Sequence, residues 1–540
     1  MIYSKSKINY RLKRYTMTET ENLLSRLCGE CNNNELYVLF VTISIIILAI
    51  LWFKFKLSNT SNGAPSLPPG PHSFPIVGYL PFLTPDLHRQ FTNMARTYGP
   101  IFKFNLGSKL HVVINTRELA KVVVRDQDEA FANRDQTVAA LALTYEGRDI
   151  VFSSMNDNWR KLRKIFVHEV LSNKNIEASG SFRRDEVRKT VKSVFGQTDS
   201  AVNVREIAFA TETNVLIRMI CENTLVERVR YSNLGAEIDM VSSNIVKIFG
   251  RVNLSDFWPS LACFDLQGVE RDMKMERDKL DKLFTSIIED RIETNFKGSK
   301  DEVEHEPRKD FVQILLDHRD EKDGTSTQIK ALLLDVMLAG TETTATTVEW
   351  AMSCIMHDPR VMKKVQEELV EIVGLNNMVE EFHLPRLKYL DATIKETLRM
   401  YPVVPFLIPR SPNKASTVGG YTIPKGCTII LNVWSIHRDP RYWDKPAEFN
   451  PERFLRDKWD YKGNNLVYFP FGSGRRVCAG LPLAEKMLMF ILASLLHSFD
   501  WSLLKGEKHD LTDKFGIALK KRDPLIAIPS QRLSNVNLYL

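Results

Sequence analysis

The sequence predicts a mainly α-helical protein with a small β-sheet region, placed behind a single N-terminal transmembrane helix. Residues 36–53 form an apolar run without a charge. Short apolar stretches between Gly78 and Val124 alternate with turn residues in the manner of strands. Helical spacing of apolar residues dominates most of the sequence that follows. A length of 540 residues suits either several domains or one large helical domain behind an anchor.

Composition and charge exclude several classes of protein. The net charge of +7 is spread over 73 basic and 66 acidic residues, and the sequence contains no zinc finger, recognition-helix or RNA-binding motif, so we expect no nucleic-acid partner. The seven cysteines are scattered and odd in number, which fits a reduced compartment rather than a disulfide framework. Cys28 and Cys31 form a lone C-x-x-C pair without the further ligands that a zinc site needs.

The N-terminal region predicts a membrane anchor. Residues 1–35 form a polar tail, and residues 36–53 are just long enough to span a bilayer core of roughly 30 Å as a helix. No small-residue cleavage site follows, so we expect the anchor to be retained. Lys54 and Lys56 favour a cytosolic C-terminal side, whereas five basic residues near the start oppose it. Translation from Met17 would remove this conflict, and both starts remain open.

A linker joins the predicted anchor to the rest of the chain. Residues 54–71 include a polar stretch and the stiff segment Leu67-Pro68-Pro69-Gly70-Pro71. Tandem prolines hold an extended path between two parts of a chain. We therefore expect residues 72–540 to form one domain after this linker.

A glycine-punctuated loop at residues 471–480 carries one cysteine, Cys478. Gly472, Gly474 and Gly480 permit backbone angles with φ > 0 and the close approach of a flat ligand. These glycines therefore indicate a binding loop in which Cys478 is the reactive side chain.

The residues around Cys478 predict a thiolate. Pro482 stands where a helix start tolerates it, and residues 483–496 continue with helical spacing. A cysteine ahead of a helix N-terminus, beside Arg475 and Arg476, is held as thiolate by the helix dipole and the cations. Such a thiolate is a nucleophile or a metal ligand, and the alternative is a buried structural cysteine.

The loop resembles the haem-binding loop of the cytochrome P450 superfamily, the haem-thiolate monooxygenases, in its spacing of Phe471, Gly474, Arg476, Cys478 and Gly480. The resemblance implies that Cys478 is the axial ligand of the iron of haem b. It also implies cofactor contacts from the rest of the loop, namely Phe471, Gly472, Arg476 and Gly480.

Further cofactor residues follow from the same resemblance. Trp159 and Arg163 are four residues apart early in a predicted helix, so they share one face and can hold one ligand together. The matching Trp and Arg of the family bind haem propionates, as does the basic residue that Arg410 matches. The other cations of this helix are expected to face outward as a basic patch: Arg160, Lys161 and Lys164.

A long helix is predicted over residues 327–357, ended by Pro359. Ala339 and Gly340 lie four and three residues before Thr343, so one face combines room for a small molecule with a hydroxyl donor. The segment resembles the family's oxygen-activation helix. The resemblance implies that Ala339 and Gly340 lie beside the cofactor, that Thr343 steers protons to dioxygen, and that Glu342 helps to supply them. The alternative is a structural threonine-rich helix.

A charge network is expected beneath the cofactor loop. Glu396 and Arg399 are three residues apart and can pair on one helix face. In the family such an E-x-x-R pair joins a later arginine, matched here by Arg453. Its role is structural.

The resemblance extends from about Pro68 to the C-terminus and is strongest to plant microsomal members that oxidise terpenoids or phenylpropanoids. It implies insertion of one oxygen atom from O2 into a small hydrophobic substrate, in the endoplasmic reticulum membrane with the domain in the cytosol. No G-x-G-x-x-G nucleotide fingerprint is present, so electrons must come from another protein. The resemblance implies that this partner is NADPH-cytochrome P450 reductase, with NADPH as the electron source.

Two apolar segments, residues 138–143 and 403–408, match substrate-facing regions of the family and favour an apolar terpenoid such as a sesquiterpene. Their alternative role is core packing. Other functions left open are a flavonoid or phenylpropanoid hydroxylase, a haem-thiolate isomerase or dehydratase, and a non-enzymatic haem-binding protein.

Overall fold

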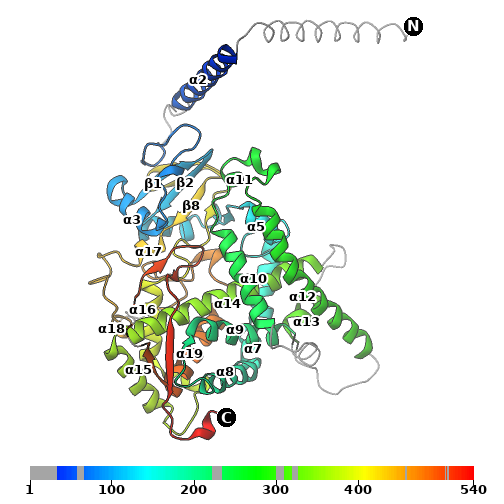
Figure 1. Ribbon diagram of the computed structural model, residues 1–540, viewed down its shortest axis with the longest axis vertical. Coiled ribbons are helices and arrows are strands. Elements are labelled where there is room, and N and C mark those ends of the chain that lie inside the picture. Colours follow the sequence, from blue (N-terminus) through cyan, green and yellow to red (C-terminus); the bar gives the residue numbers. More distant parts are fainter. Residues whose placement is uncertain are drawn as a thin grey trace. The chain divides into compact units, whose positions relative to one another are not determined.

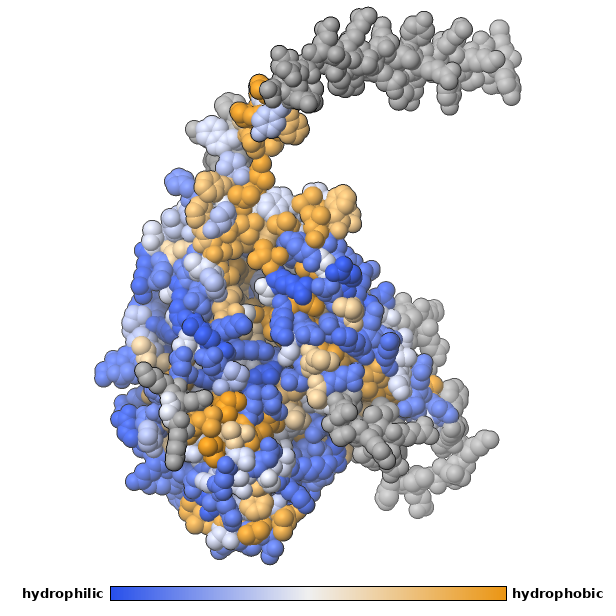
Figure 2. Space-filling view, viewed as in Figure 1, coloured by the Kyte–Doolittle hydropathy of each residue, from blue (hydrophilic) through white to orange (hydrophobic). Residues whose placement is uncertain are grey.

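The structure is a computed structural model that describes residues 33–57, 66–221, 234–298, 309–318, 326–456, 459–504, 506 and 510–540. The described residues belong to two compact units, one that includes residues 33–57 and 74–76, and another that includes residues 66–73 and the described residues from 77 onward. Within the first unit, helix α2 (Asn33–Leu57) covers the predicted anchor, and its apolar side chains between Tyr37 and Trp52 are exposed (Figures 1 and 2).

The membrane anchor stays a prediction. Among the described residues, the helix that is long and apolar enough to cross a membrane is Leu481–Ser498, which is 72% buried in protein; the apolar part of α2, Tyr37–Trp52, is shorter. The predicted tail up to residue 32, with Cys28 and Cys31, and residues 58–65 of the linker lie outside the described residues.

The second unit is mostly helical, as predicted. Its α-helices are α3 (Leu87–Tyr98), α4 (Arg117–Lys121), α5 (Val138–Leu143), α6 (Asp157–Ile165), α7 (Asn173–Ala178), α8 (Gly180–Phe195), α9 (Val204–Ile220), α10 (Leu234–Phe249), α11 (Leu254–Phe257), α12 (Val269–Gly298), α13 (Phe311–Asp317), α14 (Ser326–His357), α15 (Pro359–Ile372), α16 (Lys388–Met400), α17 (Val433–Ile436), α18 (Glu452–Arg456) and α19 (Leu481–Ser498). Short 3₁₀ or π segments are η1 (Leu80–Phe82), η2 (Val122–Asp126), η3 (Phe166–Val170), η4 (Pro259–Phe264), η5 (Glu381–Arg386), η6 (Gly474–Arg476) and η7 (Val536–Leu538).

Four small sheets accompany the helices. The largest has the strand order β1 (Ile101–Leu106), β2 (Lys109–Ile114), β8 (Thr428–Leu431), β5 (Arg410–Ser411) and β3 (Asn133–Arg134). The others pair β4 (Val202–Asn203) and β9 (Phe499–Leu503) with β12 (Ile526–Gln531), β6 (Ser416–Val418) with β7 (Tyr421–Ile423), and β10 (Asp513–Lys514) with β11 (Lys520–Lys521). In the largest sheet the register sets Arg134 opposite Arg410, so two arginines distant in sequence become neighbours.

Helix α14 organises the helical part of this unit. It spans 32 residues, is buried along most of its length, and packs against α9, α12, α16 and α19 (Figure 1). It ends at His357, and Pro359 begins α15 with Asp358 as N-cap, because proline fits the first turn of a helix but not its interior. The predicted long helix is therefore confirmed within one residue at its start.

Gly340 lies where α14 approaches α9. A Cβ at this position would lie 2.8 Å from Cδ1 of Leu216 on α9. The missing side chain therefore lets Leu216 of α9 approach α14 closely, while Gly340 itself stays partly exposed, and its place beside the cofactor stays a prediction.

The predicted charge network is present. Arg399 donates to both carboxylate oxygens of Glu396 at 2.7 and 2.9 Å, and Nε of Arg453 donates to the same carboxylate at 3.0 Å. Arg399 also donates to the carbonyl oxygens of His437 and Pro446. Because both members of the first pair are fully buried, their hydrogen bonds must replace water completely, which fixes the loops that supply the acceptors.

Candidate active site

The cysteine loop is held by its own backbone. The amide of Cys478 donates to the carbonyl of Phe471 at 2.9 Å, which closes the loop. Gly472 and Gly474 have φ of +77° and +68°, and a Cβ on Gly474 would lie 2.1 Å from the carbonyl oxygen of Val124. These two positions thus require glycine, as predicted. Gly480 has φ of −82°, so the prediction of a left-handed backbone there was wrong.

The Cys478 side chain is exposed at the end of this loop, directly before α19, whose second residue is Pro482. The backbone amides of Gly480 and Leu481 and the charge of Arg163 lower the pKa of the thiol, but its partial enclosure by protein outweighs them and raises that pKa. The thiol therefore combines an accessible sulfur with donors that favour a thiolate once a cation binds it.

Arg475 and Arg476 do not act on the thiol as predicted. Arg475 is exposed and pairs with Asp128 at 3.2 Å. Arg476 is buried, and its guanidinium donates to the carbonyl oxygens of Ala132, Ile150 and Ser153. The cation that influences Cys478 is Arg163, which also donates to the carbonyl of Val477.

Four arginines gather beside the loop: Arg134, Arg163, Arg410 and Arg476. Burial comes first among the causes that lower the pKa of Arg134, followed by Arg476, Arg410 and Arg163. Burial also lowers the pKa of Arg410 to about 10 and that of Arg476 to about 9. Because like charges in a dry site repel each other, this cluster is suited to an anion.

Arg410 carries the clearest sign of a missing anion. Its Nη2 donates to the carbonyl of Ser473 at 2.9 Å, but its buried Nη1 has no hydrogen-bond partner among the described residues. An unsatisfied buried guanidinium nitrogen costs free energy. The cluster and this orphan nitrogen fit the carboxylate groups of a haem.

Arg134 belongs to this cluster but was missed from the sequence. Its Nε donates to the carbonyl of Val151 at 2.9 Å, and its Nη1 donates to that of Ile408 at 2.6 Å. No local motif marks it, because its proximity to Arg410 arises from pairing between β3 and β5.

Helix α6 positions Trp159 and Arg163. Asn156 caps the helix by accepting the amide of Trp159 at 2.7 Å, which fixes the first turn. The buried indole donates from Nε1 to the carbonyl of Ile150 at 3.1 Å, and the guanidinium of Arg476 lies 4.2 Å from the ring centroid. The indole N–H is therefore already satisfied, and its contact with a propionate stays a prediction. Three cations of α6 are exposed, as predicted: Arg160, Lys161 and Lys164.

The residues of the oxygen-activation motif on α14 differ in their exposure to solvent. Ala339 is exposed and Thr343 is partly exposed, although they stand in an otherwise buried helix. The Thr343 hydroxyl donates to the carbonyl of Ala339 at 2.5 Å. Glu342 is buried, and Arg205 donates from Nη2 to its Oε2 at 2.6 Å, while Lys520 forms an ion pair with Oε1. The predicted acid and alcohol thus occupy different surroundings.

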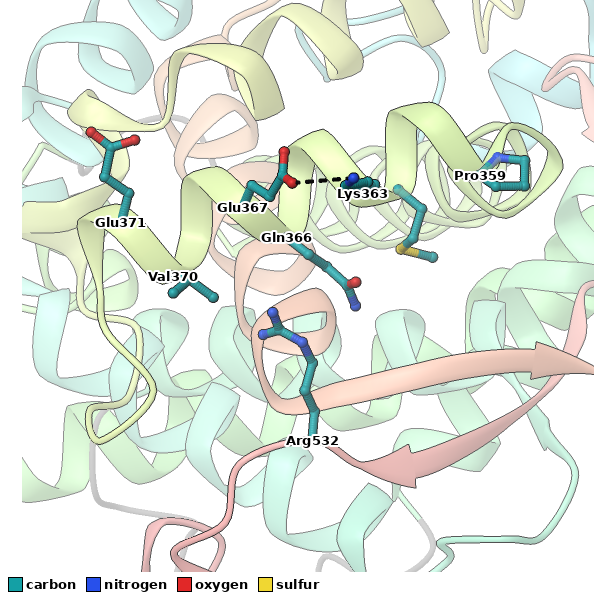
Figure 3. A pocket seen from close by; sticks show the side chains of 8 residues that line it. Pro359, Lys363, Gln366, Glu367, Val370, Glu371 and Arg532 are labelled. Carbon is teal, nitrogen blue, oxygen red and sulfur yellow. Dashed lines mark ion pairs between the residues drawn. The ribbon is translucent and has the colours of Figure 1, made fainter.

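A surface groove lies apart from these residues. Figure 3 shows the groove, lined by side chains of α15 and by Arg532, with Lys363 and Glu367 paired at 3.7 Å. It includes none of the predicted site residues. The site is therefore identified by its chemistry and not by this groove.

Comparison with known proteins identifies the family. The family model "Cytochrome P450" matches residues 68–527. Cytochrome P450 76C1 of Arabidopsis thaliana is 35% identical over 498 residues, covering 90% of this chain and 96% of the relative. Geraniol 8-hydroxylase of Catharanthus roseus is 36% identical over 499 residues (91% and 99%), and flavonoid 3',5'-hydroxylase of Solanum melongena is 36% identical over 503 residues (91% and 96%).

A solved structure shares the fold. A zebra fish cytochrome P450, determined with abiraterone, superposes with a TM-score of 0.69 at 25% identity and covers 83% of this chain and 100% of that chain. The chain belongs to the cytochrome P450 family and is a monooxygenase of that family. Such proteins bind haem through a cysteine thiolate.

Proposed function

We propose that the protein is a haem-thiolate monooxygenase in which Cys478 would supply the thiolate that binds the iron of haem b. The carrying observation is the exposed thiol on a glycine loop beside a cluster of four arginines, in which the buried Nη1 of Arg410 has no hydrogen-bond partner among the described residues. The haem, when bound, supplies the oxidative chemistry, and its thiolate ligand favours cleavage of the O–O bond. Arg134, Arg163, Arg410 and Arg476 would hold the propionates by charge and hydrogen bonds.

The chain's own residues would govern the protons. Thr343 has a hydroxyl on the open side of α14 that donates to the carbonyl of Ala339, and it would have to turn from this carbonyl to donate to dioxygen. Glu342, next in the chain, would take protons from solvent and pass them toward that hydroxyl. This assignment makes both side chains contributors to rate and leaves haem binding to the loop and the arginines.

The electrons would come from NADPH through a reductase. Exposed cations of α6 (Arg160, Lys161 and Lys164), together with Lys486 on α19, would attract an acidic reductase surface. Residues 36–53 would anchor the protein in the endoplasmic reticulum membrane with the domain in the cytosol. We expect the rate of haem reduction by the reductase to fall as the salt concentration rises, and a rate independent of salt would contradict this electrostatic attraction. Protection of the domain from protease in sealed microsomes would contradict its cytosolic orientation.

The substrate class favoured is an apolar terpenoid. Relatives of nearly equal identity are named for geraniol and for flavonoids, so the comparisons do not separate the two. Residues 403–408 carry apolar side chains that are partly buried at Val404 and Phe406, and an apolar wall binds hydrocarbon through buried area. Residues 138–143 give less support than predicted, because most of α5 is buried and packs against α12.

One experiment separates this function from its rivals. Purified protein with a reductase is tested for consumption of NADPH and O2, and the reduced protein with carbon monoxide is tested for the long-wavelength absorption of a thiolate-ligated haem. An isomerase or dehydratase would turn over without consuming O2, and a haem-binding protein would not turn over. Retention of the absorption by Cys478→Ser would overturn the ligand assignment. Turnover of flavanones but not sesquiterpenes would overturn the substrate preference.

A further inference from the structure

The loop of residues 149–153, between α5 and α6, orients part of the arginine cluster. The guanidinium of Arg476 donates to two carbonyl oxygens of this loop, at 3.1 and 2.6 Å. Nε of Arg134 donates to a third carbonyl oxygen at 2.9 Å, and the indole of Trp159 donates to one of the two that Arg476 uses, at 3.1 Å. The position of this loop therefore sets the direction of two of the four arginines.

Two aspartates fix the loop in place. The amide of Ile150 donates to Oδ2 of Asp335, on α14, at 2.9 Å. The amides of Val151 and Phe152 donate to Oδ2 of Asp149 at 3.0 and 2.6 Å. Asp149 thus folds the loop on itself, and Asp335 attaches it to the long central helix.

The carboxyl groups of Asp149 and Asp335 share a proton. Both side chains are buried, and Oδ1 of Asp149 receives no N–H or hydroxyl donor among the described residues. The carboxyl of Asp335 forms a hydrogen bond with Asp149, which requires a proton on one of the two groups. Burial, and then the charge of Asp149, raise the pKa of Asp335 well above its usual range. Asp335 is therefore the donor.

The charges around the pair keep the proton on Asp335. Arg134 on β3 and Arg476 on η6 act on Asp149 by their charge, which favours its ionised form. Charged groups on the helices packed against α14 have partners of their own, namely Asp281 of α12 with Lys330 of α14, Asp310 beside α13 with Arg291 of α12, and Arg205 of α9 with Glu342 of α14.

We propose that Asp335 is a positioning residue for the cofactor, which holds the loop of residues 149–153 against α14 through a proton that it shares with Asp149. Loss of this proton leaves two negative charges side by side in a buried place, where they repel each other. The loop then loosens, and the arginines that it orients lose their fixed direction. Because the two carboxyl groups titrate together, haem should be held more weakly as the pH rises through the pKa of the pair. The inference rests on the proposed function, since it requires haem at the arginine cluster.

The first test measures the rate at which the haem-loaded protein loses haem to excess apomyoglobin at several pH values. In Asp335→Asn the amide can accept from Ile150 and donate to Asp149 at every pH. The rate for the original protein, divided by that for Asp335→Asn, should therefore rise with pH. Asp157→Asn is the matched control, because Asp157 lies on nearby α6 with 98% of its side chain exposed, and it should follow the original protein. A ratio that does not change with pH would overturn the proposal.

Asp335→Leu tests the hydrogen bond itself, because its side chain is of similar size but cannot donate. At neutral pH it should lose haem about ten-fold faster than Asp335→Asn, since a buried carboxylate oxygen is left without a donor. Equal rates in these two variants would overturn the proposal. If Asp335→Leu does not load haem, the pH profiles of the original protein and Asp335→Asn decide the question. An original protein that retains no haem would instead contradict the proposed haem site.

The second test detects the proton directly and needs no activity. The infrared difference spectrum between the original protein and Asp335→Asn at neutral pH should contain the C=O stretch of a protonated carboxyl group, and this band should shift in D2O. Absence of the band would mean that Asp335 is ionised, which would overturn the proposal.

Discussion

Glu212 offers a quantitative test of how burial controls stability. This carboxyl group lies on α9 with 1% of its surface exposed, and its Oε2 has no hydrogen-bond partner among the described residues. Burial raises its pKa from 4.5 to about 8, although the nearby Arg183 opposes the rise. The folded protein therefore keeps Glu212 protonated at neutral pH, whereas the unfolded chain ionises it.

The sign and size of the effect follow from linkage. Between pH 4.5 and about 8 the folded state binds a proton that the unfolded state has lost, so stability falls as pH rises through this window. Each pH unit in this window lowers the free energy of unfolding by about 1.4 kcal/mol. At pH 7 the total loss amounts to roughly 3 kcal/mol. Glu212→Gln removes this dependence because an amide does not titrate there.

The assay compares denaturation midpoints of the two haem-loaded proteins at pH 5.5, 6.5 and 7.5. We expect the denaturation midpoint of Glu212→Gln, relative to that of the original protein, to rise with each step in pH. Glu206→Gln, on the same helix but exposed, should show no such trend. A difference between Glu212→Gln and the original protein that stays constant across this range would refute the reasoning.

Three further substitutions test the site and its support. Arg399→Leu should lower the free energy of unfolding by about 3–5 kcal/mol, because it leaves the buried charge of Glu396 without its partner. A denaturation midpoint near that of the original protein would contradict this. Gly474→Ala should abolish haem loading, since its Cβ would lie 2.1 Å from a backbone carbonyl oxygen. Gly480→Ala should retain haem, because the backbone there has a φ of −82°. Equal haem content in the two variants would contradict this reasoning. Thr343→Ala should keep haem but divert electrons from NADPH to peroxide, and unchanged coupling of NADPH to product would exclude its proton role.

The parts of the fold that local patterns control were predictable. The long helix followed from its apolar spacing and from Pro359, and the pairing of Glu396 with Arg399 followed from their separation of three residues. Both depend on neighbours within one helix, so the sequence contains the geometry. The backbone of the loop that carries Cys478 was predictable in part, because Gly472 and Gly474 have the positive φ angles that glycine permits.

Features that depend on distant partners were not predictable. Arg134 reaches the arginine cluster through β-pairing with Arg410, and Lys520 reaches Glu342 from a hairpin far along the chain. Gly340 was interpreted as space for a ligand, but the close approach of Leu216 from α9 was not foreseen. A small or charged residue signals that something lies close to it, but the identity of the neighbour comes from the tertiary fold.

Helix α19 has a consequence for the way the protein is made. Its residues, Leu481–Ser498, are apolar enough to enter a bilayer, yet they form part of the protein core. The helices it packs against, α8, α14, α15 and α16, all leave the ribosome earlier. Their apolar faces must therefore stay uncovered during synthesis until α19 arrives. Because Cys478 lies just before this helix, the domain can complete its core and gain Cys478, the proposed haem ligand, only in the same late stage of translation.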